Sequence, residues 1–144
     1  GVSAAALVES AGDLKIARKI VENRMFRVEA NDWGAVRLLS GSIGWVAGPH
    51  LTIYNPETLR MLHELGARRW VAPFEATRAM VAGVLGELPR PMESEVFAHG
   101  RMPLALSARC FTARRHNLQK ESCAYRCIDH PDGLALDTRE GERW

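Results

Sequence analysis

The chain has 144 residues, of which 47% are hydrophobic and 25% charged, and its formal net charge is +2 at pH 7. This composition is typical of a globular domain and excludes a disordered chain or a coiled coil. A net charge this small gives no reason of its own to expect nucleic-acid binding. No apolar run approaches the roughly 18 residues that a membrane-spanning helix requires, so we expect no membrane span.

Short apolar runs alternate with amphipathic stretches over the first hundred residues. The short runs are typical of strands, whereas apolar residues that recur every three or four positions indicate helices. We expect strands at 26–30, 43–47, 70–72 and 93–98, a further strand within 1–12, and an extended segment at 50–55. We expect helices at 14–22, 33–39, 56–65 and 75–85.

Residues that favour helix ends mark several of these boundaries. Asp13, Asp32 and Asn55 precede the first three predicted helices. Their side-chain oxygens can accept hydrogen bonds from the unpaired N–H groups of the first helical turn. Pro56 suits the first turn of the third helix because no N–H partner is needed there, and Gly66 suits the position just after its end. Local chemistry therefore predicts three helix starts and one helix end.

The internal strands have their centres near Val28, Val46, Val71 and Val96, so strand–helix units recur every 18 to 25 residues. Such alternation favours an α/β fold in which crossover helices join parallel strands. The residues alone leave two architectures open, an open doubly wound sheet and part of an eight-stranded (β/α) barrel. A complete barrel needs at least about 200 residues, so this chain would form only part of one.

In both architectures the chemistry lies at the carboxyl ends of the strands. Polar residues occupy those positions: Glu29, Asp32, His50, Asn55, Glu75 and His99. We take Glu29, His50, Glu75 and His99 as catalytic candidates, because carboxylates and imidazoles that converge can act as acids, bases or ligands. A hydrogen-bonded structural residue is the alternative for each. The chain lacks GxSxG, HExxH, phosphate-loop and dinucleotide glycine motifs, which argues against hydrolysis by a standard apparatus.

All three cysteines lie within 18 consecutive residues, at Cys110, Cys123 and Cys127. A helix that spans the last two would place both thiols on one face, because they are four positions apart. Thiolates suit an iron–sulfur cluster or zinc, and His116 or His130 is near enough in sequence to be a fourth zinc ligand. Free structural cysteines or one disulfide are the alternatives to a metal. Clustered cysteines of odd number, without an export signal, indicate a cytoplasmic protein.

Six basic residues surround these thiols: Arg101, Arg109, Arg114, Arg115, Lys120 and Arg126. Guanidinium groups can stabilise an anionic cluster or bind an anionic ligand. A solvated basic loop is the alternative. Arg109 and Arg114 flank Cys110 most closely, so we expect these two to be the cofactor-binding residues.

A likeness to a known family is carried by residues 95–110, EVFAHGRMPLALSARC, which resemble the signature of the collagenase-like peptidase (U32) family. PLALSARCFTAR and the CxxxC pair after it are similar to the branch of that family that supports oxygen-independent ubiquinone biosynthesis. Upstream, VEANDWGAV, GWVAGPHLTIYNPETL and RRWVAPFEATR resemble the same branch. The resemblance implies parallel strand–helix repeats in a partial TIM-like (β/α) barrel with a cysteine-containing loop at 100–127. We accordingly expect residues 1–144 to be a single-domain fragment, the central part of such a barrel.

That resemblance also implies a four-iron (4Fe–4S) cluster held by four cysteines. Cys110, Cys123 and Cys127 would be three of its ligands, with the fourth outside this chain and zinc as the alternative metal. A heterodimer with a sister subunit of the same family is implied as well. The implied reaction is hydroxylation of the quinone-precursor ring without dioxygen, with a prephenate-like anion as the oxygen donor. We expect no nucleic-acid partner.

The chain departs from the peptidase signature at Arg101, Pro103 and Ala108, where a small residue, a cysteine and a glycine are usual. These departures favour a non-hydrolytic subunit of an anaerobic hydroxylase complex. The alternatives are a collagenase-like peptidase, an RNA-hydroxylation factor of the same family, and a zinc-stapled interaction module.

Overall fold

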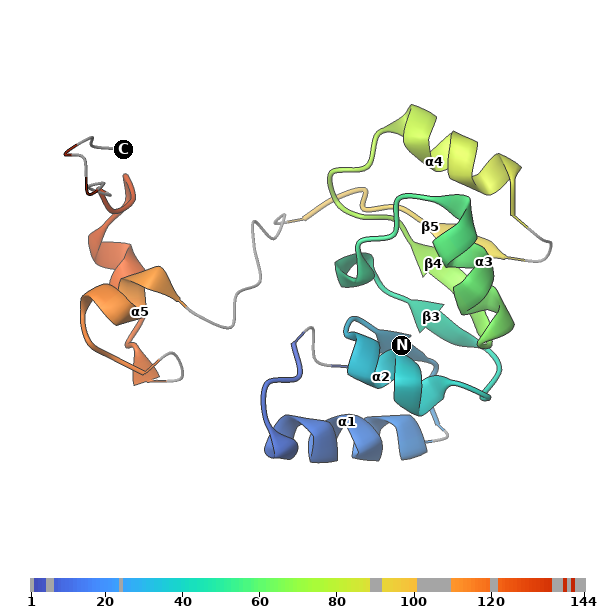
Figure 1. Ribbon diagram of the computed structural model, residues 1–144, viewed down its shortest axis with the longest axis horizontal. Coiled ribbons are helices and arrows are strands. Elements are labelled where there is room, and N and C mark those ends of the chain that lie inside the picture. Colours follow the sequence, from blue (N-terminus) through green and yellow to red (C-terminus); the bar gives the residue numbers. More distant parts are fainter. Residues whose placement is uncertain are drawn as a thin grey trace. The chain divides into compact units, whose positions relative to one another are not determined.

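The computed structural model describes residues 2–4, 7–23, 25–88, 92–100, 110–119, 122–135, 139 and 141. The chain clusters into two compact units, Gly1–Leu106 and Ser107–Trp144. The first unit carries a sheet with helices α1 to α4, and the second carries short helices and all three cysteines (Figure 1). The strand ends and the thiols therefore belong to different units.

The first unit is built on an open, five-stranded parallel sheet. Its strands are β1 Val2–Ser3, β2 Val28–Ala30, β3 Trp45–Ala47, β4 Ala67–Val71 and β5 Glu93–Glu95. Their order in the sheet follows their order in the sequence, and every neighbouring pair is parallel. The α/β class and the parallel strands are thereby confirmed, although β4 begins and ends earlier than predicted and β5 ends earlier. Among the described strands the order does not reverse, as it would at the switch point of a doubly wound sheet, and closure into a barrel is not observed.

An α-helix follows each of the first four strands (Figure 1). The helices are α1 Ala11–Glu22, α2 Trp33–Leu39, α3 Pro56–Glu64 and α4 Arg78–Gly86. Two predicted caps are confirmed: Asp32 accepts a hydrogen bond from the Gly34 N–H at 2.6 Å, and Asn55 accepts one from the Thr58 N–H at 2.8 Å. In the part of the chain that the structure describes, no helix is long and apolar enough to cross a membrane.

Three other local predictions are wrong. The N-cap of α1 is Ser10, because its hydroxyl accepts from the Asp13 N–H while the Asp13 carboxylate accepts from the Ser10 N–H, which is a capping box. The helix predicted from residue 75 begins only at Arg78, after its N-cap Thr77. The segment expected to be extended at 50–55 begins instead with the 3-10 helix η1, Pro49–Leu51, which ends at a left-handed Thr52.

One hydrophobic core lies on the helix side of the sheet. Alternate strand residues enter it, since successive side chains of a strand point to opposite faces: Val28, Ala30, Trp45, Ala47 and Trp70. The helices add Val36, Leu39, Leu59, Leu62 and Val84 to the same core. Trp70, Leu59 and Leu62 are 0% exposed, so this core fixes the strands whose ends carry the candidate site.

Ion pairs connect strands on the opposite face of the sheet. Glu93 of β5 contacts Arg69 of β4 at 2.8 Å and Arg27, just before β2, at 3.1 Å. Arg69 also contacts Glu95 at 3.3 Å. In a flat sheet β2 and β5 would lie about 14 Å apart, three times the usual strand spacing. The Arg27–Glu93 contact therefore bridges strands that are not neighbours.

The second unit holds the thiol-bearing segment. It contains α5 Phe111–Arg115, whose N-cap is Cys110, and the 3-10 helix η3 Arg126–Asp129. Ala113 is buried, and its carbonyl accepts a hydrogen bond from the Leu118 N–H at 2.8 Å, just after α5 ends. This short helix thus positions the first cysteine at its start.

Candidate functional site

Asn31, immediately after β2, connects two of the predicted catalytic residues. It is only 3% exposed. Its side-chain Nδ2 donates a hydrogen bond to Glu29 Oε1 at 2.6 Å, and its side-chain oxygen Oδ1 accepts one from the His50 backbone N–H at 3.3 Å. Because buried polar groups need such partners, Asn31 holds the ends of β2 and β3 in a fixed relation. The sequence alone gave no sign of this residue's role.

A glycine makes room for the Asn31 side chain. A β-carbon on Gly48 would lie 2.2 Å from Asn31 Oδ1 and 2.8 Å from the Ala30 carbonyl oxygen. The Gly48 N–H donates to that same carbonyl at 2.8 Å. Close approach of backbone and side chain therefore requires glycine here, and the position of His50 depends on it.

An aromatic row follows the ends of β3, β4 and β5. The ring centroids of His50 and Phe74 are 5.4 Å apart, and those of Phe74 and Phe97 are 5.5 Å apart with the planes at 81°. Both separations fall in the range of favourable aromatic pairs. Phe97 is 37% exposed, so the row offers ring surface to a ligand at the carboxyl ends of the strands.

Glu75 is paired with a tyrosine that the sequence did not single out. The Tyr54 hydroxyl donates a hydrogen bond to Glu75 Oε1. This hydrogen bond lowers the pKa of Glu75 below its ordinary value and is the largest cause of the raised pKa of Tyr54. Glu75 therefore remains an ionised acceptor at neutral pH rather than a proton donor. Tyr54 and Glu75 are 21 positions apart in the sequence, so no local pattern reveals the pair.

The fourth candidate, His99, lies apart from these contacts. It is exposed on the segment after β5, and the hydrogen bonds and ring contacts of the strand-end residues do not include it. The structure thus links the Glu29 carboxylate to the backbone of His50 through Asn31, and pairs Glu75 with Tyr54.

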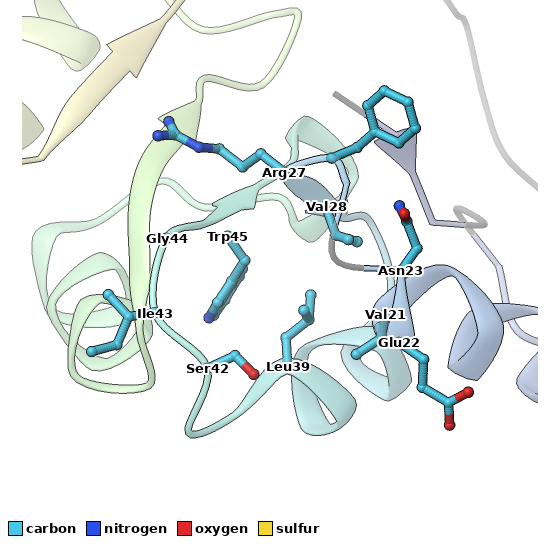
Figure 2. A pocket seen from close by; sticks show the side chains of 11 residues that line it. Val21, Glu22, Asn23, Arg27, Val28, Leu39, Ser42, Ile43, Gly44 and Trp45 are labelled. Atoms are coloured by element: carbon cyan, nitrogen blue, oxygen red, sulfur yellow. The ribbon is translucent and has the colours of Figure 1, made fainter.

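The cavity in Figure 2 lies at the other end of the strands. Its volume is about 440 Å³, and it is lined by Val21, Glu22, Asn23, Phe26, Arg27, Val28, Leu39, Ser42, Ile43, Gly44 and Trp45. The side chains of Leu39 and Trp45 point into it, whereas the Arg27 guanidinium extends toward β4. The lining residues come from the carboxyl ends of α1 and α2 and from the amino ends of β2 and β3 with the loops before them. In parallel α/β folds the chemistry lies at the opposite ends, so we assign no reaction to this cavity.

The three cysteines are free thiols, so the disulfide alternative is not observed. Cys110 and Cys123 are half-buried and Cys127 is exposed. The helix expected to span the last two is absent, because Ala124 and Tyr125 adopt left-handed backbone angles, with φ of 50° and 53°. The thiols therefore do not share a helical face as predicted.

The fit of these residues to a metal rests on their chemistry. Within the described residues, no group of three or more His, Cys, Asp or Glu side chains is arranged to hold a metal ion. Three free thiols in one unit nevertheless supply the soft donors that iron–sulfur clusters and zinc prefer. The donor type fits a cluster, and its assignment to Cys110, Cys123 and Cys127 stays a prediction.

The basic residues around the thiols have different surroundings. Arg114 borders a cavity of about 540 Å³ inside the second unit, together with Phe111, Thr112, Arg115, Leu134 and Ala135. Arg126 instead forms an ion pair with Asp129 at 3.1 Å. Three of the predicted basic residues lie outside the described residues: Arg101, Arg109 and Lys120. Of the predicted cofactor-binding pair, only Arg114 is thus placed, beside a cavity that an anion could enter.

A comparison with models of known protein families gives a match. The family model described as peptidase family U32 matches residues 12–130, which include the strand-end residues and all three cysteines. No solved structure matches the chain.

Proposed function

Because the chain belongs to peptidase family U32, we propose that it acts in the UbiV-like branch of that family. There it serves as an iron–sulfur accessory subunit of oxygen-independent ubiquinone biosynthesis. The observation that carries this proposal is the set of three free thiols within one compact unit. Hydrolysis needs no such thiol set, and the departures from the peptidase signature at Arg101, Pro103 and Ala108 also favour the non-hydrolytic role.

In this proposal Cys110, Cys123 and Cys127 provide three thiolate ligands, and a fourth ligand comes from outside these 144 residues. When bound, a four-iron cluster supplies one-electron transfer. The chain itself holds the cluster and controls the charge around it. Arg114, exposed beside its cavity, is placed to attract an anion such as the carboxylate of a prephenate-like donor.

The strand-end residues provide the second part of the proposal. The row of His50, Phe74 and Phe97 would stack against the ring of a quinone precursor, since aromatic faces favour offset or edge contacts with other rings. Glu29, held by Asn31, would accept a hydrogen bond from a ring hydroxyl. These residues bind and orient the substrate and exclude water from one side of it.

We further propose that the open sheet is part of a TIM-like barrel, as the resemblance implies. Two observations support this. The strands follow one another in sequence order, which is the order in such barrels. The Arg27–Glu93 contact spans two intervening strands, which a sheet curving toward that face accommodates more readily than a flat one. A sister subunit would then cover edges that an open sheet leaves unpaired.

Complementation of a strain that lacks the natural gene tests the function. The parent protein and the control Ser122→Ala should restore ubiquinone without oxygen, whereas Cys123→Ala should not. Ubiquinone made with oxygen should be the same in all three strains. Normal anaerobic ubiquinone in the Cys123→Ala strain would contradict the proposal. Release of peptides from a collagen-like substrate by the purified parent would favour the peptidase alternative instead.

A further inference from the structure

The cavity of about 540 Å³ in the second unit has features beyond the single guanidinium that the proposed function uses. Its volume lies in the range of pockets that enclose small organic ligands. The described residues that line it are Phe111, Thr112, Arg114, Arg115, Leu134 and Ala135. None of these is acidic, and the phenylalanine, leucine and alanine side chains are apolar. The cavity therefore combines positive charge with apolar surface.

One wall of this cavity is a single face of α5. Arg114 and Arg115 lie three and four positions after Phe111, so the three side chains share one side of the helix. Ala113, by contrast, is buried and anchors α5 to the rest of the unit. The Phe111 side chain is 71% exposed. Its ring is therefore available to a ligand beside two guanidinium groups.

The other wall, Leu134 and Ala135, is tied to α5 through a pair of histidines. Nε2 of His116, the C-cap of α5, lies 2.9 Å from Nε2 of His130, the C-cap of η3. One ring thus donates a hydrogen bond to the other. The Gly133 N–H donates to the His130 carbonyl oxygen at 3.0 Å, in a turn directly before Leu134. These hydrogen bonds hold the two walls next to one another.

The two guanidinium groups at this cavity carry charge that no described residue neutralises. Neither Arg114 nor Arg115 forms an ion pair within the described part of the chain. Arg126 of the same unit is instead paired with Asp129 at 3.1 Å. One guanidinium can bind one carboxylate through two parallel hydrogen bonds. A second guanidinium on the same face therefore matches a second negative charge.

We propose that this cavity binds a small organic dianion with an apolar body, either a phosphate monoester or a dicarboxylate. A phosphate monoester carries a charge of about −1.5 to −2 at pH 7. Arg114 and Arg115 bind the anionic groups, and the apolar body lies against Phe111 and Leu134. For the part that the ligand takes in a reaction, the inference rests on the proposed function, in which Arg114 attracts an anionic donor. Binding itself requires neither the cluster nor the thiols.

Calorimetric titration of the full chain, kept reduced and free of oxygen, tests the proposal with two probes, phenyl phosphate and phthalate. Binding of phenyl phosphate alone identifies a phosphate monoester as the ligand, and binding of phthalate alone identifies a dicarboxylate. Arg114→Gln and Arg115→Gln should each weaken binding about fivefold or more, because each removes a charged hydrogen-bond donor. The control Arg126→Gln removes an arginine that Asp129 already neutralises and should bind like the parent.

Three results of this titration would overturn the proposal. The first is that the parent binds neither probe. The second is that Arg114→Gln and Arg115→Gln both bind like the parent. The third is that Arg126→Gln weakens binding as much as they do, which would show attraction by the overall charge of the unit rather than by this cavity.

The apolar wall and the charge of the ligand are tested separately. Phe111→Ala should weaken binding of the dianionic probe and leave the weaker binding of inorganic phosphate unchanged. Benzoate, which has the ring but only one negative charge, should bind more weakly than the dianionic probe. Parent-like binding of that probe by Phe111→Ala, or benzoate binding as tight as that of the dianion, would overturn the proposal.

A cysteine variant separates this inference from the proposed function. Cys123→Ala should lose the iron–sulfur cluster and still bind the dianionic probe like the parent. Loss of dianion binding in Cys123→Ala would overturn the inference, because the cavity would then depend on the thiols. Normal anaerobic ubiquinone in a Cys123→Ala strain would contradict the proposed function alone.

Discussion

Asn31 and Gly48 are matched to one another: the carboxamide oxygen of Asn31 lies only 2.2 Å from the point where a β-carbon on residue 48 would be. The side-chain NH₂ group of Asn31 donates a hydrogen bond to Glu29, and the side-chain oxygen of Asn31 accepts one from the His50 backbone N–H. A change at residue 48 is therefore transmitted to both candidate residues at the ends of β2 and β3.

Gly48→Ala should destabilise the protein by about 1–3 kcal/mol, the usual cost of forcing an extra carbon into a packed site. Gly83→Ala is the matched control, because nothing lies within 4 Å of a β-carbon there and the residue is within α4. Gly83→Ala should stabilise the folded protein by about 0.5–1 kcal/mol, because alanine favours a helix more than glycine does. Denaturant unfolding measures both, and equal stabilities of the two variants would contradict the packing described.

The Tyr54–Glu75 hydrogen bond should be visible in a pH titration. This hydrogen bond raises the pKa of Tyr54 above its ordinary value. The stabilisation that it gives the folded protein is therefore complete below the pKa of Tyr54 in the unfolded state, and it is lost as the pH rises through the raised pKa of the folded state. It lowers the pKa of Glu75, and there the contribution is lost as pH falls through the lowered value. The pair thus stabilises the folded protein between the lowered pKa of Glu75 and the raised pKa of Tyr54.

Ultraviolet absorbance of the phenolate measures the upper limit. The chain has two tyrosines, so the titration uses a Tyr125→Phe background in which only Tyr54 ionises. Glu75→Gln in that background should move the ionisation of Tyr54 to lower pH. An unchanged titration curve would show that the hydrogen bond is not formed in solution.

Acid should weaken the ion pairs on the face of the sheet opposite the helices. Arg69, and then Arg27, hold the pKa of Glu93 below its ordinary value. The stabilising effect of Glu93 is therefore present above its unfolded-state pKa and lost as pH falls through the lowered one. In denaturant unfolding, Glu93→Gln should reduce the free energy of unfolding at neutral pH. Below the lowered pKa of Glu93 the substitution should have no such effect. The control Glu64→Gln, outside this network on α3, should show no such pH-dependent difference; a constant difference for Glu93→Gln would contradict the assignment.

The elements that the sequence predicted well depend on short-range chemistry. Asp32 and Asn55 cap their helices because each needs only the N–H groups of the next turn, which lie two or three residues away. The misplaced cap of α1 follows from the same chemistry, since Ser10 and Asp13 bond reciprocally and either alone looks like a cap. Parallel strand pairing also followed from the spacing of the apolar runs.

The site features that the sequence could not reveal depend on contacts between distant residues or on rare backbone angles. Asn31 and its partner His50 are 19 positions apart in the sequence, and Tyr54 and Glu75 belong to different loops. The expected helix across Cys123 and Cys127 is broken by left-handed angles at Ala124 and Tyr125, residues that rarely adopt them. Nothing in that local sequence, such as a glycine, marks the break.

The presence of the cluster can be measured by the iron content and visible absorption of the protein expressed from its natural gene and purified without oxygen. We predict a broad visible band and about four iron atoms per protein, as a four-iron cluster requires. Cys123→Ala should lose both the band and the iron, while Ser122→Ala retains them. A parent protein without iron, or a Cys123→Ala protein with the full iron content, would contradict the claim that these thiols hold an iron–sulfur cluster.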